Sequence, residues 1–446
     1  MTNIREVAFD TLLDYEKKKT SYVPVKEVLD KMSFLDKIDR GFLGRLIEGV
    51  IERKVTLDYI LNQFSKVPVN KQKPPIRVIL RLGVYQIMYM DSVPDYSAVN
   101  ECVKLAKKRN LSNLSGVVNA VLRNISKNKD NIKWPDRETD VIECLSVKYS
   151  CPEWITRMLI EEQGEENAEA ALSNSVSIRP VTARVNCSIS TIDEVLEKCS
   201  DDKAAISVCK SPVLDNVVVF DKVDNVSDIC VVKEGLVCVQ DAGSVLVGNL
   251  SGIRKDDTVL DVCAAPGGKS LHAADIASEG KVISCDLSEK KTSRIQENIN
   301  RCGFNNIEAL TRDATVHYDE FDGIADVIIA DVPCSGIGVM GRKNDIKYNL
   351  APEQIDELAG LSKTIIKNIA SYLKKGGTLM FSTCTISQRE NLDMVKYIRE
   401  ELRFESVSIY EELPCALKCE SAKDGYIQLY GKDGLTDGFF IAKFKK

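Results

Sequence analysis

The first 126 residues show apolar positions with a helical period. Spacings of three and four recur along this region, for example at Phe42, Leu43, Leu46, Ile47, Val50 and Ile51. Short polar or proline-containing breaks separate the segments, and "PPIRVILRLGVYQIMYM" begins with prolines that suit the first turn of a helix. The pattern predicts a helical bundle over residues 1–128, followed by the charged stretch "SKNKDNIKWPDRETD" as a linker.

The pattern changes between residues 140 and 240. A helical stretch that contains "SCPEWITRML" is followed by short valine-rich runs such as "NVVVF" and "GLVCVQD". Such β-branched runs, with the helix-like "TIDEVLEKC" among them, predict a small α+β module.

From about residue 250, strand-like runs alternate with helical segments. The expected strands contain "TVLDVCA", "KVISCDLS", "IEALTRDA", "ADVIIADVP" and "GTLMFSTC". A long helix should place one apolar face toward the sheet, formed by Ile355, Leu358, Leu361, Ile365, Ile369 and Leu373. The alternation predicts a doubly wound parallel sheet over residues 241–446, with "DGFFIAKF" as a last strand for which an antiparallel orientation is open.

The composition indicates a soluble multidomain protein. A length of 446 residues suggests about three domains, and no run approaches the roughly 18 uncharged apolar residues of a membrane span. We therefore expect a cytoplasmic protein, with reduced thiols because the 15 cysteines include no Cys-x-x-Cys pair. Only two histidines, His272 and His317, are present, which argues against a structural zinc site and against a Cys/His nucleophile.

Basic residues are concentrated near the N-terminus. Residues 1–128 hold 22 Lys and Arg against 14 Asp and Glu, whereas the whole chain has a net charge of −6. A basic surface favours a phosphate backbone, although solvated helix surfaces can give the same count. Arg77, Arg81 and Arg123 lie in apolar helices, where they could pair with acids or contact phosphates.

Candidate chemistry follows the ends of the predicted strands. "LDVCAAPGGKS" combines a strand, a glycine-rich turn and a helix start, which brings backbone N–H groups close to a ligand, although a plain tight turn is the alternative. Asp286, Asp313 and Asp331 end three successive strands, and three acids at one sheet edge favour a common cleft over three helix caps. Cys334 in "DVPCSG" and Cys384 in "FSTCTI" also follow strands.

These motifs resemble a known family. "CAAPGGK", "DVPCSG" and "STCT", in that order, are similar to the motifs of the RNA cytosine carbon-5 methyltransferases of the Nol1/Nop2/Sun group. The helical region, with "DRGFLGRLIEGVIERK" and "VVNAVLRN", resembles the NusB-type RNA-binding domain of the bacterial Sun branch. The resemblance covers nearly the whole chain. It implies a NusB-like domain over 1–128, a linking or RNA-binding module over 140–240 and a Rossmann-like methyltransferase domain over 241–446.

The resemblance also implies a role for each motif. The turn would hold the methionine and ribose part of S-adenosylmethionine, Asp286 would bind the ribose hydroxyls and Asp313 would lie at the adenine. Asp331 would line the reaction centre, Cys384 would be the nucleophile and Cys334 would assist release of the product. The implied cofactor-binding set is Cys263, Ala264, Ala265, Pro266, Gly267, Gly268, Lys269, Asp286, Asp313 and Asp331.

The chemistry of cytosine agrees with these roles. Carbon-5 is too weak a nucleophile to accept a methyl group unaided, so a thiolate must first add to carbon-6. Hydrogen bonding or protonation at the ring N3, the role expected of Asp331, would stabilise the charge that develops. A free thiol has a pKa of about 8.5, so the site must stabilise the thiolate. The cofactor sulfonium and a helix start after Cys384 are two candidate sources.

Two neighbouring segments flank the cysteine motifs. "GRKNDIKY" carries Arg342, Lys343 and Lys347, which would either clamp the RNA backbone or form a solvated loop. "SQREN" departs from the family's proline-and-glutamate pattern at Gln388 and Arg389, and we expect these helix-start positions to change no chemistry.

The expected activity is methylation of a cytosine in 16S ribosomal RNA, either naked or in an early small-subunit particle, by a monomer without a metal. Transfer RNA, another RNA or DNA is an alternative substrate, although DNA enzymes use the Pro-Cys cysteine and would leave Cys384 without a purpose. A non-enzymatic RNA-binding assembly factor is the remaining alternative. Loss of a cysteine or of the acids would have favoured it, and neither is lost.

Overall fold

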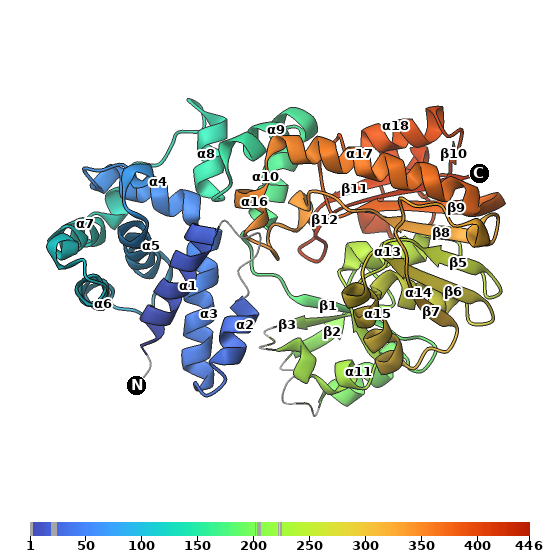
Figure 1. Ribbon diagram of the computed structural model, residues 1–446, viewed down its shortest axis with the longest axis horizontal. Helices are drawn as coiled ribbons and strands as arrows, with labels where there is room; N and C mark the ends of the chain where they lie inside the picture. The colour runs from blue at the N-terminus through green and yellow to red at the C-terminus, as the bar shows by residue number, and fades with distance from the viewer. Residues whose placement is uncertain (1–2, 19–24, 201, 203–206, 222, 224) are drawn as a thin grey trace. The chain divides into compact units, whose positions relative to one another are not determined.

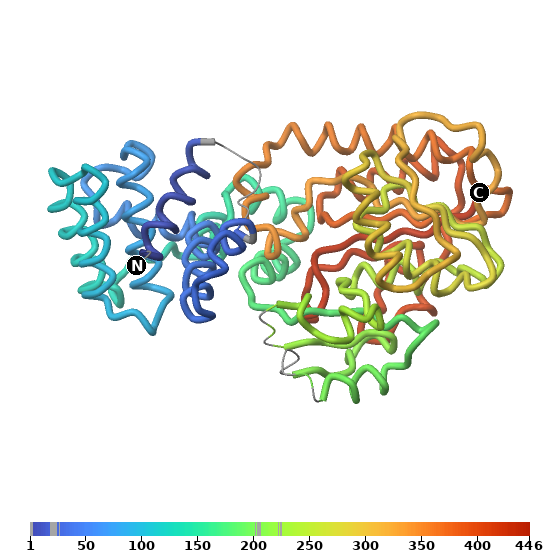
Figure 2. Tube along the Cα trace, turned by 60° about the horizontal axis from the view of Figure 1, so that its bottom comes forward, coloured from blue at the N-terminus to red at the C-terminus, as the bar shows by residue number. Residues whose placement is uncertain are grey.

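The computed structural model describes residues 3–18, 25–200, 202, 207–221, 223 and 225–446 (Figures 1 and 2). The chain divides into two compact units. One unit comprises Met1–Val176 with Met340–Leu350, and the other comprises Ser177–Val339 with Ala351–Lys446. Within the described ranges, no helix is both long enough and apolar enough to cross a membrane.

The first unit is built from helices, and those up to residue 127 share one apolar core. Side chains at helical spacing meet there, and Leu43, Ile47, Ile60, Ile79 and Leu122 are fully buried. The helices are α1 (Ile4–Lys18), α2 (Val25–Lys31), α3 (Lys37–Glu52), α4 (Lys54–Phe64), α5 (Pro74–Tyr89), α6 (Asp95–Lys108), α7 (Ser115–Lys127), α8 (Val141–Lys148), α9 (Glu153–Gln163), α10 (Glu165–Asn174) and the short α16 (Ile346–Asn349).

Two of the three arginines in apolar helices form ion pairs inside this unit. Arg77 Nη2 lies 2.7 Å from Glu16 Oε2, and Arg81 Nε lies 2.6 Å from Asp58 Oδ1. Arg81 also pairs with Glu16 and is only 5% exposed. The salt-bridge alternative therefore holds for both arginines. Arg123 is exposed on α7, so a phosphate contact stays open for it.

The segment Met340–Leu350 belongs to the first unit, although it follows the Cys334 loop along the chain. Lys347 is 1% exposed, and its ammonium donates a hydrogen bond to the carbonyl oxygen of Glu52 over 2.9 Å, at the last residue of α3. The Tyr348 hydroxyl donates to the same oxygen over 3.2 Å.

Lys347 thus has a structural role within the helical unit. Burial lowers the pKa of Lys347 to about 8, and its one hydrogen bond satisfies an orphan carbonyl at a helix end. The idea that Lys347 clamps RNA is therefore wrong. Arg342 and Lys343 are exposed, and the RNA-clamp alternative stays open for them.

The second unit begins with a small antiparallel sheet. Its strand order is β2-β3-β1-β4, and two short helices accompany it. The elements are β1 (Val181–Val185), α11 (Ile192–Ser200), β2 (Ser207–Lys210), β3 (Val217–Asp221), α12 (Cys230–Lys233) and β4 (Val237–Val239). The α+β module expected over 140–240 is thus divided, because α8 to α10 lie in the helical unit.

A larger mixed sheet forms the rest of the second unit. Strands β9, β8, β5, β6 and β7 lie side by side and parallel, and β12 pairs antiparallel with β9, as the open alternative for "DGFFIAKF" allowed. The strands are β5 (Thr258–Asp261), β6 (Lys281–Asp286), β7 (Ile307–Thr311), β8 (Ala325–Asp331), β9 (Leu373–Thr383), β10 (Glu405–Ser406), β11 (Tyr426–Tyr430) and β12 (Gly438–Lys445).

Helices cover both faces of this sheet (Figure 1). The helices are α13 (Ala242–Leu250), α14 (Gly268–Ile276), α15 (Glu289–Cys302), α17 (Pro352–Ile369) and α18 (Leu392–Glu400). Successive residues of β5 point to opposite faces of the sheet. Val259 packs with α13 and α14, whereas Leu260 packs with α17 and α18. The predicted doubly wound architecture is confirmed.

The apolar face of α17 differs from the prediction. The helix ends at Ile369, so Leu373 is the first residue of β9, and Leu361 is 37% exposed. The buried face is formed instead by Ile355, Ala359, Ser362, Ile365, Ile366 and Ile369. A short 3₁₀ turn at Ala370–Tyr372 separates helix from strand, and the apolar period of the sequence continues across it.

Candidate active site

The carboxyl ends of five parallel strands meet at one edge of the large sheet. The chain order reverses at β5, which has β6 on one side and β8 on the other. Ligands of open α/β sheets bind outside the carboxyl ends at such a reversal. The predicted turn, acids and cysteines follow these strand ends, so the topology brings the sequence motifs to a common edge.

The glycine-rich turn connects β5 to α14. Gly267 has a φ of 105°, a region that disfavours a side chain, and an added Cβ would lie 3.3 Å from Ile295. Its N–H donates to the carbonyl of Ala264 over 2.7 Å, and α14 begins at the next residue, Gly268. The turn therefore offers bare backbone and helix-start N–H groups to a ligand.

Asp286 at the end of β6 braces this turn. Its Oδ2 accepts from the N–H of Ala265 over 2.9 Å, and its Oδ1 accepts from Leu287 N over 2.7 Å and from Lys291 Nζ over 2.9 Å. A carboxylate has about four acceptor sites, so these contacts leave one for a ligand hydroxyl.

Asp313 follows β7 in a partly exposed loop. Its Oδ1 accepts from the N–H and the hydroxyl of Thr315 over 2.9 and 2.7 Å. Asp313 lines a narrow cavity together with Cys285 and Tyr318. The second oxygen of the carboxylate keeps acceptor sites for a polar ligand edge.

Lys269, Asp331 and Ser382 form a polar cluster across three strand ends. The ammonium of Lys269 lies 2.7 Å from Asp331 Oδ2, and the Ser382 hydroxyl donates to Asp331 Oδ1 over 2.9 Å. Burial alone would lower the pKa of Lys269, but the carboxylate of Asp331 outweighs it and raises that pKa above its usual value. Lys269 is therefore a fixed cation at the centre of the site, and it also interacts electrostatically with Cys384.

The two predicted cysteines lie in contact. Cys334 follows β8 and Cys384 follows β9, and their sulfur atoms are 3.2 Å apart. The hydrogen bond to Cys384 and burial together raise the pKa of Cys334 well above its usual value. Cys334 therefore stays a thiol, in hydrogen-bond contact with the sulfur of Cys384.

A fourth strand-end acid, Asp261, was missed in the sequence. It ends β5 and is 0% exposed, and its Oδ2 accepts from the Ser270 hydroxyl over 2.6 Å. Burial raises its pKa to about 7. The rule that singled out the other three acids would have found it, because Asp261 directly precedes the glycine-rich turn.

The segment after Cys384 differs from expectation. Gln388 and Arg389 lie in a turn and α18 begins at Leu392, so no helix start adjoins the cysteine. A helix N-terminus is thus wrong as the source of thiolate stabilisation. Arg389 pairs with Asp356 of α17 over 2.9 Å.

The predictions about disulfides and metal ions can be compared with the structure. All 15 cysteines are free thiols, as predicted. Across the described ranges, one group could hold a metal ion: His317, Asp319 and Asp322, all exposed, with ligand atoms within 4.8 Å of one another. The expected absence of a metal stays a prediction.

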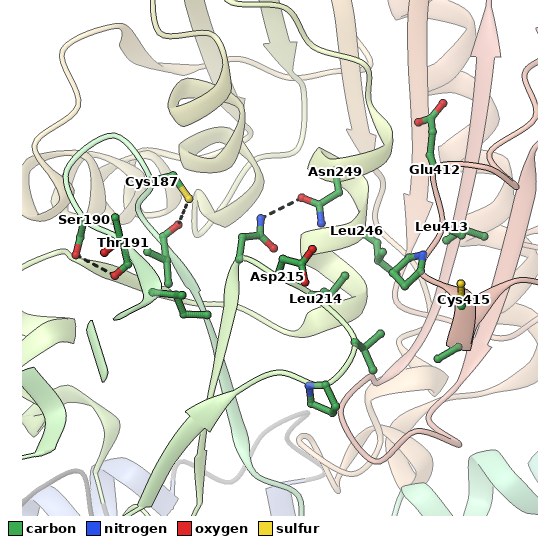
Figure 3. A pocket seen from close by; sticks show the side chains of 17 residues that line it. Cys187, Ser190, Thr191, Leu214, Asp215, Leu246, Asn249, Glu412, Leu413 and Cys415 are labelled. Atoms are coloured by element: carbon green, nitrogen blue, oxygen red, sulfur yellow. Dashed lines mark hydrogen bonds between the residues drawn. The ribbon is translucent and has the colours of Figure 1, made fainter. Parts of the chain in front are cut away.

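A cleft of the second unit lies away from these motifs. Its volume is about 930 Å³, and it lies between the small sheet and the loop after β10 (Figure 3). Its lining includes Cys187, Asp215, Asn249, Glu412 and Cys415, and it includes none of the predicted site residues.

Comparison with known proteins agrees with the geometry. The family model described as 16S rRNA methyltransferase RsmB/F matches residues 250–445, and the NusB family model matches residues 2–127. "Probable ribosomal RNA small subunit methyltransferase B" of Bacillus subtilis is 34% identical over 450 residues, which cover 100% of this chain and 99% of the relative. The protein of the same description from Synechocystis is 29% identical and covers both chains fully.

Solved structures share the fold. The crystal structure of PH0851 has a TM-score of 0.79 at 19% identity and covers 100% of this chain and 99% of its own. NSun6 from Pyrococcus horikoshii with SFG has a TM-score of 0.58 at 19% identity, covering 66% of this chain and 98% of its own.

The doubly wound sheet, the glycine-rich turn with Asp286 and the matching family models define an S-adenosylmethionine-dependent methyltransferase with an N-terminal NusB domain. Within that class, the family of the chain can also be identified, because its similarity to one group of relatives extends over the whole chain. The chain belongs to the ribosomal RNA small subunit methyltransferase B family.

Proposed function

We propose that this protein methylates carbon-5 of a cytosine in 16S ribosomal RNA through a covalent adduct between Cys384 and the base. The observation that carries the proposal is the contact of two thiols, 3.2 Å apart, at neighbouring strand ends. Relatives over the full length of the chain are described as small-subunit ribosomal RNA methyltransferases, which supports the substrate. In this proposal residues 1–128 bind RNA, residues 140–240 link the domains or contact RNA, and residues 241–446 carry the reaction.

The cofactor supplies an electrophilic methyl group when bound. The turn Cys263–Lys269 would hold its methionine and ribose part through backbone N–H groups. Asp286 would accept from a ribose hydroxyl at its remaining acceptor site, and Asp313 would lie at the adenine. The start of α14 at Gly268, directly after the turn, supports this assignment, since the first N–H groups of a helix are free to bind a ligand.

Cys384 would attack carbon-6 of the cytosine as a thiolate. A hydrogen bond from the Cys334 thiol and the nearby ammonium of Lys269 would stabilise the negative sulfur. Attack places electron density on carbon-5, which can then accept the methyl group. The two stabilising groups replace the helix start that the sequence suggested.

Asp331 would orient the target base. As an ion-paired carboxylate it is a hydrogen-bond acceptor, so it would hold a protonated N3 or accept from the exocyclic amine. Ser382 fixes the second carboxylate oxygen, which leaves the orientation of Asp331 well defined.

Cys334 would act after methyl transfer. A base takes the carbon-5 proton, the electrons of that C–H bond restore the ring double bond, and the carbon-6–sulfur bond breaks to release Cys384 as a thiolate. The thiol of Cys334 would stabilise this departing sulfur. Its raised pKa keeps this proton available at neutral pH.

Substitution of the two cysteines tests the proposal. With tritiated S-adenosylmethionine and unmodified 16S ribosomal RNA, Cys384→Ala should transfer no label, whereas the exposed Cys415→Ala should transfer label at the wild-type rate. Undiminished transfer by Cys384→Ala would refute the nucleophile assignment.

Cys334→Ala should instead trap the adduct. A slowly migrating protein–RNA band should accumulate on a denaturing gel, because methyl transfer proceeds while release fails. The double substitution Cys334→Ala, Cys384→Ala should show no band. Absence of the band in the Cys334→Ala protein would argue against the release role of Cys334.

The substrate is tested separately. Bisulfite sequencing of ribosomal and transfer RNA from cells with and without the protein should show one cytosine in 16S ribosomal RNA that loses protection. Loss of protection in transfer RNA alone would redirect the substrate without changing the cysteine roles.

A further inference from the structure

One buried carboxylate touches both cysteine loops. Glu390 is 2% exposed and lies between Cys384 and α18. It accepts from the N–H of Ser335 over 2.7 Å, from the Ser335 hydroxyl over 2.5 Å and from the Thr385 hydroxyl over 3.1 Å. The two hydroxyls are themselves 2.8 Å apart. These three residues form a closed unit, the carboxylate brace (Glu390, Ser335 and Thr385).

The partners of Glu390 are adjacent to the cysteines. Ser335 directly follows Cys334, and Thr385 directly follows Cys384. The brace therefore joins, through one side chain, the two loops whose sulfur atoms lie 3.2 Å apart. The mechanism proposed above gives this carboxylate no role.

Other hydrogen bonds also hold these loops, and one of them crosses between the two: the Gly338 N–H donates to the Cys384 carbonyl over 3.1 Å. Asn391 accepts from the Thr383 hydroxyl over 2.6 Å and donates to the Thr385 carbonyl over 3.0 Å, so it acts on the Cys384 side. Glu390 accepts two hydrogen bonds from Ser335 of the Cys334 loop, and the Thr385 hydroxyl adds a further contact with Ser335. Loss of Glu390 would remove the two hydrogen bonds that Ser335 donates to it, whereas the contact between the Ser335 and Thr385 hydroxyls and the hydrogen bond from the Gly338 N–H to the Cys384 carbonyl would remain.

We propose that Glu390 is a positioning residue that holds the Cys334 thiol against the sulfur of Cys384, so that release of the product follows methyl transfer. The proposal rests on the release role of Cys334. The negative carboxylate also adds to the groups that raise the pKa of Cys334, which favours the protonated donor.

Sulfur proximity gives a readout that does not depend on activity. Dibromobimane alkylates two neighbouring thiols with loss of two bromides, and mass spectrometry identifies the bridged peptides. In the wild-type protein we expect a Cys334–Cys384 bridge. Glu390→Gln keeps the length of the side chain but replaces one acceptor oxygen by an amide donor, so we expect bridging to slow by about 10-fold, the equivalent of about 1.4 kcal/mol.

Catalysis gives the second readout. Glu390→Gln should bind S-adenosylmethionine like the wild type and accumulate the protein–RNA adduct, as Cys334→Ala does. Asp356→Asn is the matched control, because it removes the exposed ion pair of the adjacent Arg389 and should leave bridging and release unchanged.

Thr385→Val keeps the proposal testable if Glu390→Gln fails to fold. It removes one hydroxyl of the brace and should slow bridging by less than Glu390→Gln, and it should add nothing further in the Glu390→Gln background. Wild-type bridging in both variants would overturn the proposal. Full activity of Cys384→Ala would instead overturn the proposed function, and the bridging rates would still report on the brace.

Discussion

Replacement of Asp261 by Asn should stabilise the catalytic unit at high pH but not at low pH. The carboxyl is 0% exposed, and burial raises its pKa from 3.8 to about 7. Because the folded pKa is the higher one, the stability that Asp261 contributes is fully present below pH 3.8 and is lost as the pH rises through 7. The neutral amide cannot ionise and so avoids this loss.

The magnitude follows from the two pKa values. Each pKa unit equals about 1.4 kcal/mol, so the full difference is about 4 kcal/mol. Roughly 1.5 kcal/mol is already lost at pH 5, where the unfolded carboxyl is ionised, and about 2.5 kcal/mol is lost between pH 5 and pH 8. A change in the hydrogen bond from Ser270 cancels when the two pH values are compared.

Hydrogen exchange followed by mass spectrometry is the suitable assay. Both tryptophans, Trp134 and Trp154, lie in the helical unit, so tryptophan fluorescence does not report on β5. The opening free energy of peptides from β5 and β6 should rise in Asp261→Asn, relative to wild type, by about 2.5 kcal/mol more at pH 8 than at pH 5. Asp256→Asn, which removes an exposed carboxylate nearby, is the control. A difference that is the same at both pH values would refute the reasoning.

Three further substitutions test other groups. Lys269→Met removes the cation beside Asp331 and should lower single-turnover methyl transfer by about 100-fold, with partial rescue by Lys269→Arg; an unchanged rate would contradict the role. Asp286→Asn should weaken S-adenosylmethionine binding by about 10-fold in calorimetry, and equal affinity would exclude a ribose contact. Lys347→Met should change the pH dependence of urea unfolding, which tryptophan fluorescence can follow. The pKa of Lys347 in the folded protein is lowered to about 8. The stability that Lys347 contributes is therefore present above pH 10.5 and is lost as the pH falls through 8. The free energy of unfolding of the wild type relative to the variant should rise by about 3 kcal/mol between pH 8 and pH 10.5, and a constant difference would disprove the buried ammonium.

The fold could be predicted where the hydrophobic period is strong. Strands β5 to β9 and the helical bundle lie where the pattern placed them, because each element buries a face that its own residues define. The pattern failed at Leu373, since an apolar period does not mark the turn at which a buried helix passes into a buried strand. The hydrophobic pattern also grouped residues 141–174 with the strands that follow them. Their packing within the first unit is a tertiary contact, which leaves no mark in the local sequence pattern.

The site could be predicted only in part. Acids and cysteines at strand ends are visible in the sequence, and the resemblance paired Cys334 with Cys384. The ion pair of Lys269 with Asp331 joins residues 62 positions apart, and the contact of Glu390 with Ser335 joins residues 55 apart. Such pairings depend on which strands are neighbours, and the order of parallel strands follows from long-range packing.

The capping of α3 by Lys347 has a consequence for dissecting the protein. A shortened protein that starts after the helical bundle would keep Met340–Leu350 but lose the carbonyl and the apolar surface that this segment covers. The buried ammonium of Lys347 would become a solvated cation 13 residues after Cys334, in a stretch of chain without its native partners. Reduced activity of such a fragment would then reflect a damaged catalytic loop as much as lost RNA affinity. Because Met340–Leu350 packs within the first unit, no single cut in the chain separates the residues of the two units.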